Sequence, residues 1–229
     1  MPAETPLRAV LFDIDGTLVD SNYLHVDAWD RAFADEGIPA PVWRIHRSIG
    51  MDSKKLLETL AGDADDDAAE RAKERHSDYY KESVDRLRPL EGARELVRAL
   101  AARGLKVVLA TSAPEDELEI LRGVLDVDDA VTAATSAGDV GTAKPDPDII
   151  EAALAKADVA AGEAIMVGDA VWDVHAAARA GVPTIGVLSG GFGEAELRDA
   201  GAAEVYDDVA ALLEALDASA IGRRSDATA

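Results

Sequence analysis

Residues 9–17 read Ala9-Val10-Leu11-Phe12-Asp13-Ile14-Asp15-Gly16-Thr17, and this stretch decides the fold. Its mainly apolar first part predicts a short buried strand, and the Asp-Gly-Thr that follows predicts a tight turn. Side chains alternate along a strand, so Asp13 and Asp15, one residue apart, are expected on the same face. Gly16 lets the backbone turn sharply, and the hydroxyl of Thr17 can hold that turn.

The same pattern of a short apolar run between helical stretches recurs further along the chain. The later runs are residues 106–112, 129–135, 164–169 and 182–188. Helices are expected at residues 93–103, 146–157 and 171–180. Strands that alternate with helices form parallel sheets, which predicts an α/β fold with a doubly wound, Rossmann-like sheet.

A long helical segment interrupts this alternation. Almost eighty residues with helical periodicity separate the first strand from the helix at 93–103, too many for a simple connection. We therefore expect residues 21–88 to form an inserted all-helical cap domain that begins with Ser21 as a helix N-cap. Residues 1–20 and 89–216 would form the core domain, and the polar residues 217–229 a flexible tail.

Composition limits the classes of function. The chain has 229 residues and no cysteine, which excludes disulfides and cysteine nucleophiles. Its formal charge of −22 argues against a nucleic-acid partner, because such binding relies on clustered Lys and Arg. No apolar stretch approaches the roughly 20 residues of a membrane helix, so a soluble cytoplasmic protein without a membrane partner is expected.

A third acidic position follows a later apolar run. Asp169 ends the run 164–169, and Asp173 lies one helical turn further on. The carboxyl ends of parallel strands are where ligands bind, so Asp169 is expected to meet Asp13 and Asp15 there. Close carboxylates repel unless a cation intervenes, and Mg²⁺ prefers oxygen ligands. Taken alone, Asp169 could instead cap a helix.

Two further positions suit a phosphate group. Thr111 and Ser112 end the run 106–112 and offer a hydroxyl and backbone N–H groups, although turn formation would explain them almost as well. Lys144 precedes Pro145 in a segment too rigid for a helix interior, and its ammonium could neutralise a crowded group of carboxylates and phosphate.

Taken in order, these motifs resemble the four sequence motifs of the haloacid dehalogenase superfamily. They are Asp13-Ile14-Asp15-Gly16-Thr17, Thr111-Ser112, Lys144-Pro145, and Gly168-Asp169 with Asp173. The resemblance covers most of the core and implies a Mg²⁺-dependent phosphatase that hydrolyses a small phosphomonoester.

The resemblance also implies roles for these residues. Asp13 would be the nucleophile that forms an aspartyl-phosphate, and Asp15 would be the general acid and base, with its backbone carbonyl on the metal. Asp169 would bind the metal directly, and Asp173 would support the site from outside the coordination sphere. The phosphoryl group would be held by Gly16, Thr111, Ser112 and Lys144.

The helical insert resembles the small cap of the phosphoglycolate phosphatase and β-phosphoglucomutase group, and the choice between hydrolase and mutase stays open. His25 resembles the cap-hinge histidine of the mutases, but similar strings occur in many phosphatases. Residues 49–53 lack the Lys and Arg that flank the corresponding mutase glycine, and Gly168-Asp169 stands where mutases have an acidic pair. Both departures favour a phosphatase. Besides His25, we consider Arg47 and Lys54 as substrate contacts, although a solvated helix face would explain both.

A signalling receiver module is an alternative from another class. Such modules resemble this chain in combining clustered Asp residues, a hydroxyl residue and a Lys, but they are about half its length and carry the acceptor after a middle strand. Asp15 would also catalyse hydrolysis of the phospho-state that a signal requires.

We interpret Gly190-Gly191-Phe192-Gly193 as a flexible turn that follows a different strand from those that carry the motif set. The sequence predicts neither the natural phosphoester nor the oligomeric state.

Overall fold

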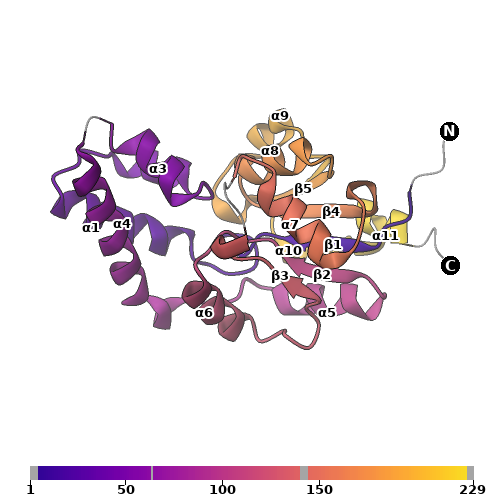
Figure 1. Cartoon of the computed structure of the whole chain (residues 1–229). Helices are drawn as coiled ribbons and strands as arrows, with labels where there is room; N and C mark the ends of the chain where they lie inside the picture. Colours follow the sequence, from indigo (N-terminus) through magenta and orange to yellow (C-terminus); the bar gives the residue numbers. More distant parts are fainter. Residues whose placement is uncertain (1–4, 63, 140–143, 226–229) are drawn as a thin grey trace.

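The computed structural model describes residues 5–62, 64–139 and 144–225. The molecule is elongated, with a sheet-based core at one end and a helical cap at the other (Figure 1). The first and last described residues lie at the end of the core away from the cap. No helix in the described part of the chain has the length and hydrophobicity needed to cross a membrane.

The core is built on a six-stranded parallel sheet of order β3-β2-β1-β4-β5-β6. The strands are β1 Ala9–Phe12, β2 Lys106–Leu109, β3 Ala133–Ala134, β4 Ala164–Gly168, β5 Thr184–Val187 and β6 Glu204–Tyr206. β1 pairs with β2 on one side and with β4 on the other. The strand order therefore reverses at β1, and the carboxyl ends of β1 and β4 form the crevice where doubly wound sheets bind ligands.

Helices cover both faces of the sheet. Val10 and Phe12 of β1 pack with the apolar faces of α5 Ala93–Ala102, α6 Glu115–Leu125 and α10 Val209–Glu214. Ala9 and Leu11 pack with α7 Asp148–Ala157 and α8 Val171–Arg179. Successive residues of a strand point to opposite faces, which explains why alternate residues of β1 pack against different helices. Because both faces are buried, every residue of the strand is apolar.

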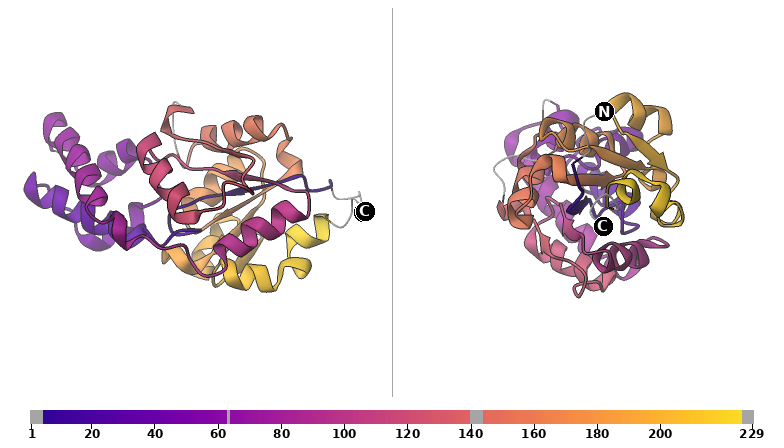
Figure 2. Two further views of the ribbon diagram at one scale, coloured as in Figure 1. Left: turned by 90° about the horizontal axis from the view of Figure 1, so that it is seen from below. Right: turned by 90° about the vertical axis from the view of Figure 1, so that its right-hand side faces the viewer.

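The described residues of the cap form four α-helices and one 3₁₀ turn between β1 and α5. They are α1 Asn22–Asp35, α2 Val42–Ser48, α3 Ser53–Leu60, α4 Asp66–Lys81 and η1 Val84–Arg86. The cap has its own apolar core, which includes Trp29, Phe33, Ile45, Leu56 and Ala72. These elements lie within the range 21–88 for which a helical insert is expected, and the left view of Figure 2 shows them beyond one end of the sheet.

Backbone contacts hold together the two chain segments that connect the cap with the core. Val19 forms bridges with Asp15 and Pro89, and the Asp20 N–H donates to the Arg88 carbonyl at 2.9 Å. The entering and leaving chains therefore run side by side.

The structure differs from the expected elements in three places. The run 129–135 contributes a strand of two residues, Ala133–Ala134, and β6 was not predicted, because three residues are too few for a periodic pattern. The expected flexible tail is wrong for residues 217–225: a 3₁₀ turn and helix α11 Ala220–Ser225 pack there, because Ile221 is fully buried in the core. Residues 226–229 of that tail, like residues 1–4 and 140–143 of the expected core, lie outside the described residues.

Candidate active site

The first functional turn follows β1 at the crevice. The backbone N–H of Asp13 donates to the carbonyl of Val167 at 3.0 Å, which continues the pairing with β4. Gly16 then adopts a φ of +76°, and a Cβ there would lie 2.2 Å from Nδ2 of Asn22. A glycine is required at this turn both by its left-handed backbone and by the close approach of the cap.

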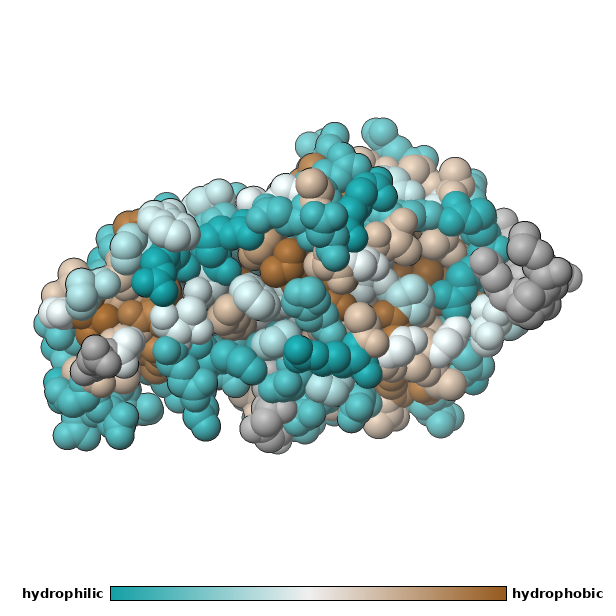
Figure 3. Space-filling model, turned by 90° about the horizontal axis from the view of Figure 1, so that it is seen from above, coloured by the Kyte–Doolittle hydropathy of each residue, from teal (hydrophilic) through white to brown (hydrophobic). Residues whose placement is uncertain are grey.

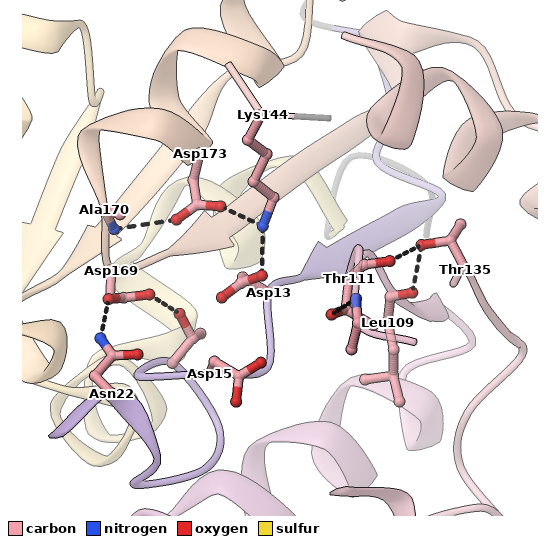
Figure 4. A network of polar contacts seen from close by, with 12 residues as sticks. Asp13, Asp15, Asn22, Leu109, Thr111, Thr135, Lys144, Asp169, Ala170 and Asp173 are labelled. Carbon is pink, nitrogen blue, oxygen red and sulfur yellow. Dashed lines mark hydrogen bonds and ion pairs between the residues drawn. The ribbon is translucent and has the colours of Figure 1, made fainter. Parts of the chain in front are cut away.

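Three buried carboxylates and one ammonium meet beside this turn (Figure 4). Oxygen atoms of Asp13, Asp169 and Asp173 lie within 4.8 Å of one another. The Nζ of Lys144 contacts Oδ1 of Asp13 and lies 2.7 Å from Oδ1 of Asp173. The other oxygen of Asp173 accepts the Ala170 N–H at 3.0 Å, so both oxygens of Asp173 are engaged by the protein.

The charges of this cluster do not balance. Burial raises the pKa of Asp13 well above its usual range, although Lys144 opposes the rise. Burial, with Asp173 close by, raises the pKa of Asp169 to about 7. Lys144 pairs with two of the three carboxylates, those of Asp13 and Asp173, so the buried oxygen-rich site carries an excess of negative charge once all three are ionised. Such a donor set fits a hard divalent cation, which would keep the carboxylates ionised.

Asp169 is held from two sides. Thr17 Oγ1 donates to its Oδ1 at 3.0 Å, and Asn22 Nδ2 donates to its Oδ2 at 2.9 Å. The alternative reading of Asp169 as a helix cap is wrong, because Asp173 accepts the N–H of Ala170, the N-cap residue of α8. Asn22 was not predicted, since nothing in the local sequence indicates a contact with a residue 147 positions away.

The side chain of Asp15 belongs to a different set of contacts. Its Oδ1 accepts a 2.5 Å hydrogen bond from Ser21 Oγ and lies 3.4 Å from Nε2 of His25. Burial alone would raise the pKa of Asp15, but the hydrogen bonds of His25 and Ser21 hold it below its usual value. The expected convergence of the Asp13, Asp15 and Asp169 carboxylates is therefore wrong for Asp15. Ser21 occupies the N-cap position of α1, but its side chain bonds Asp15 instead of the helix.

His25 is in turn held by the cap. Its Nδ1 lies 3.1 Å from Nε2 of His76, and its ring stacks on Tyr80 with centroids 3.9 Å apart. Although burial opposes it, contact with Asp15 raises the pKa of His25. Burial, with the charge of His25 adding to the effect, holds the pKa of His76 well below its usual range. His76 was not predicted, because a single histidine in a charged helix carries no local signal.

The catalytic candidates share one cavity of about 410 Å³ between core and cap. Its core wall includes Asp13, Asp15, Thr111, Ser112 and Lys144, and its cap wall includes His25 and Lys54. Thr111 Oγ1 accepts the Ala113 N–H at 3.1 Å, and its carbonyl accepts from Thr135 at 3.0 Å, so the turn after β2 is rigidly held.

Arg47 and the glycine-rich segment 190–193 lie in a second contact between cap and core. Arg47 Nη2 pairs with Glu196 Oε1 at 2.5 Å, and its guanidinium lies 3.9 Å from the ring centroid of Phe192. Arg47 does not line the cavity described above. The interpretation of residues 190–193 as a flexible turn away from the site is wrong, because a Cβ on Gly190 would lie 1.6 Å from Oδ2 of Asp169.

Comparison with known proteins agrees with this geometry. The model of the haloacid dehalogenase-like hydrolase family matches residues 7–181. The chain belongs to this family. A phosphoglycolate phosphatase from Rhodospirillum rubrum is 33% identical over 215 residues, which cover 90% of this chain and 89% of that protein. The crystal structure of a hydrolase from Pseudomonas syringae is 39% identical with a TM-score of 0.88, and the match covers 92% of this chain and 98% of that one.

A β-phosphoglucomutase from Clostridium difficile shares the fold of this haloacid dehalogenase-like hydrolase. Its TM-score is 0.80 at 20% identity, and the match covers 97% of this chain and 98% of that one. At that identity the likeness concerns the fold alone, so the mutase alternative is not favoured. The predictions of the superfamily, of the α/β fold and of a hydrolytic enzyme are confirmed, and the receiver-module alternative is set aside.

Proposed function

We propose that the chain is a Mg²⁺-dependent phosphatase that hydrolyses a small phosphomonoester through a phosphorylated Asp13. The observation that carries this proposal is the arrangement around Asp13 in one cavity. Asp13 contacts Lys144 and belongs to the acidic cluster, and Asp15 and His25, 3.4 Å apart, line the same cavity.

Asp13 would attack the phosphorus atom of the substrate. Lys144 engages its Oδ1, which leaves Oδ2 for the attack. The new bond joins Oδ2 to phosphorus, and the bond from phosphorus to the ester oxygen breaks. The backbone and hydroxyl groups of Thr111 and Ser112, with Lys144, would hold the phosphoryl oxygens.

Asp15 would handle the proton in both steps. The leaving alkoxide needs a proton, and Asp15 would supply it as the general acid, with Nε2 of His25 as its partner 3.4 Å from Oδ1. In the second step Asp15 would take a proton from a water molecule as the water oxygen bonds to phosphorus. The bond from phosphorus to Oδ2 of Asp13 breaks, which releases inorganic phosphate and restores the carboxylate.

The Mg²⁺ ion would be held by Asp13, Asp169 and the backbone carbonyl of Asp15. When bound, it supplies positive charge that neutralises the carboxylates and the phosphoryl group. Asp173 would support the site by fixing Lys144, since one of its oxygens pairs with that ammonium and the other with the Ala170 N–H.

The substrate would be a phosphorylated small metabolite, and the cap would select it. The relative from Rhodospirillum rubrum is a phosphoglycolate phosphatase, which makes phosphoglycolate the first compound to assay. Lys54 and His25 line the cap wall of the cavity and are the proposed substrate contacts. The net charge of −22 argues against nucleic acid as the substrate, because its binding relies on clustered Lys and Arg.

The test is hydrolysis of phosphoglycolate, sugar phosphates and nucleotides with Mg²⁺ or with EDTA, beside an isomerisation assay on β-glucose 1-phosphate. Asp13→Asn should abolish turnover and keep the thermal unfolding midpoint, because it removes the attacking charge at nearly constant volume. The matched control is Asp20→Asn, an exposed position in the same segment, which should keep full activity. Turnover by Asp13→Asn at the parent rate would refute the nucleophile, and isomerisation faster than hydrolysis would favour the mutase.

A further inference from the structure

Asn22 is a residue of the cap that contacts a candidate metal ligand in the core. It is the first residue of α1, and its side chain is 4% exposed. Its Nδ2 donates to Oδ2 of Asp169 at 2.9 Å, as Figure 4 shows. The contact lies directly after the hinge formed by Val19 and Asp20, so it spans the boundary between the two domains.

The orientation of the Asn22 amide follows from the chemistry of its partner. The NH₂ group of Asn22 donates to Oδ2 of Asp169, and the ionised carboxylate that a bound cation favours can only accept hydrogen bonds. The Oδ1 of Asn22 is then buried, and within the described ranges 5–62, 64–139 and 144–225 it has no hydrogen-bond partner. A buried acceptor without a partner is unusual, and here it lies beside a site that suits a hydrated cation.

Asp169 is thus positioned by one donor from each domain. Thr17, in the core turn, donates to Oδ1, and Asn22, in the cap, donates to Oδ2. The two donors keep the carboxylate plane in one orientation, because rotation would break at least one of these bonds. Partners outside the coordination sphere orient metal ligands in this way and affect metal affinity strongly.

We propose that Asn22 is a positioning residue that orients Asp169 for cation binding and gives the cap a direct part in forming the metal site. This inference rests on the proposed function only in taking Asp169 as a Mg²⁺ ligand. Its Oδ1 would accept a hydrogen bond from a water molecule held by the ion. Removal of the Asn22 amide should therefore weaken Mg²⁺ binding before any substrate is present.

The experiment measures Mg²⁺ binding to the full chain by isothermal titration calorimetry, without substrate. Asn22→Ala and Asn22→Leu should both bind Mg²⁺ about 10-fold to 100-fold more weakly than the parent protein. Leu fills a similar volume without a donor, so it separates hydrogen bonding from packing. Asp30→Ala, on the exposed side of the same helix, is the control and should bind as the parent does.

Two further readouts exclude a merely structural role. The thermal unfolding midpoint in EDTA should stay close to that of the parent for the Leu variant. The Mg²⁺ concentration for half-maximal activity should rise in step with the dissociation constant, while kcat at saturating Mg²⁺ recovers. Equal Mg²⁺ affinity of the parent and Asn22→Leu would overturn the inference. Absence of Mg²⁺ binding by the parent would instead refute the proposed metal site.

Discussion

At the scale of single residues, Asp169 depends on how closely its neighbours approach it. Thr17 and Asn22 hold its two oxygens, and Gly190 packs directly against it. The volume around this carboxylate is therefore as important as its hydrogen bonds, because a metal ligand displaced by about 1 Å loses much of its function.

Gly190→Ala tests that packing. The added Cβ would lie 1.6 Å from Oδ2 of Asp169, so the carboxylate must move. We expect kcat/KM to fall by about 100-fold, since misplacement of this size has such effects. The control is Gly123→Ala in α6, where a Cβ meets nothing within 4 Å. That variant should keep its activity and gain about 0.5–1 kcal/mol of stability. Equal activity of the two variants would show that the segment carrying Gly190 can shift without displacing Asp169.

The protonation of Asp169 gives a prediction for pH. Its pKa in the folded chain is about 7, above the value of 3.8 expected when unfolded. Between these values the unfolded state binds fewer protons, so this group lowers the stability of the metal-free protein as pH rises. Bound Mg²⁺ favours the ionised form, so the gain in unfolding midpoint from EDTA to Mg²⁺ should grow with pH across this window.

Asp169→Asn is the control for that prediction, because an amide does not titrate. Its midpoint in EDTA should depend less on pH than that of the parent between pH 3.8 and about 7. A gain from Mg²⁺ that shrinks as pH rises would contradict the assignment of this carboxylate to the metal.

At the scale of elements, α2 of the cap and α9 Glu194–Ala200 of the core form a second contact away from the hinge. The Nε2 of His46 lies 3.0 Å from the carbonyl oxygen of Gly190, and Arg47 pairs with Glu196 over the ring of Phe192. Through this contact, the position of the cap is linked to Gly190, the glycine that packs on Asp169.

Arg47→Ala tests whether this contact joins domains or binds substrate. The pair is 35% and 46% exposed at its two side chains, and exposed pairs contribute about 0.2–1 kcal/mol, so the loss of stability should be small. If Arg47 only joins the domains, the KM for the substrate should change by no more than about twofold. Such a change is smaller than the loss of even one weak contact with the substrate would cause. Lys54→Ala, which removes a cavity-lining cation, should raise KM more. A larger increase in KM for Arg47→Ala than for Lys54→Ala would indicate that Arg47 contacts the substrate.

At the scale of the whole molecule, the net charge of −22 acts on stability. Figure 3 shows hydrophilic side chains spread over one face with apolar ones between them. Asp and Glu number 45 against 23 Lys and Arg, and such an excess of one charge repels itself in the compact state. The acidic cluster adds to this repulsion inside the protein. Screening should therefore stabilise the fold.

We expect the thermal unfolding midpoint in EDTA to rise as KCl is raised from low concentration past about 0.1 M, where the Debye length falls below about 10 Å. A neutral osmolyte at equal osmolality is the control for effects other than screening. A midpoint that falls with KCl would mean that surface ion pairs, such as Arg71 with Glu36, outweigh the net repulsion.

Much of the core could be predicted from the sequence. The apolar run before Asp13 and the later runs, at whose ends Thr111 and Asp169 lie, report strands through local periodicity. Because parallel strands end at one edge, that pattern also indicates which side chains meet there. The helical cap follows in the same way from a long segment with helical period.

Tertiary packing alone decided the details around these residues. The carboxylate of Asp15 turns to Ser21 and His25 and away from the acidic cluster. Asn22 and Gly190 approach Asp169, the first across 147 residues of sequence. Periodicity is a short-range signal that determines which face of an element is apolar. Which side chains of the cap reach the core depends on how the two domains pack, and no local pattern encodes that.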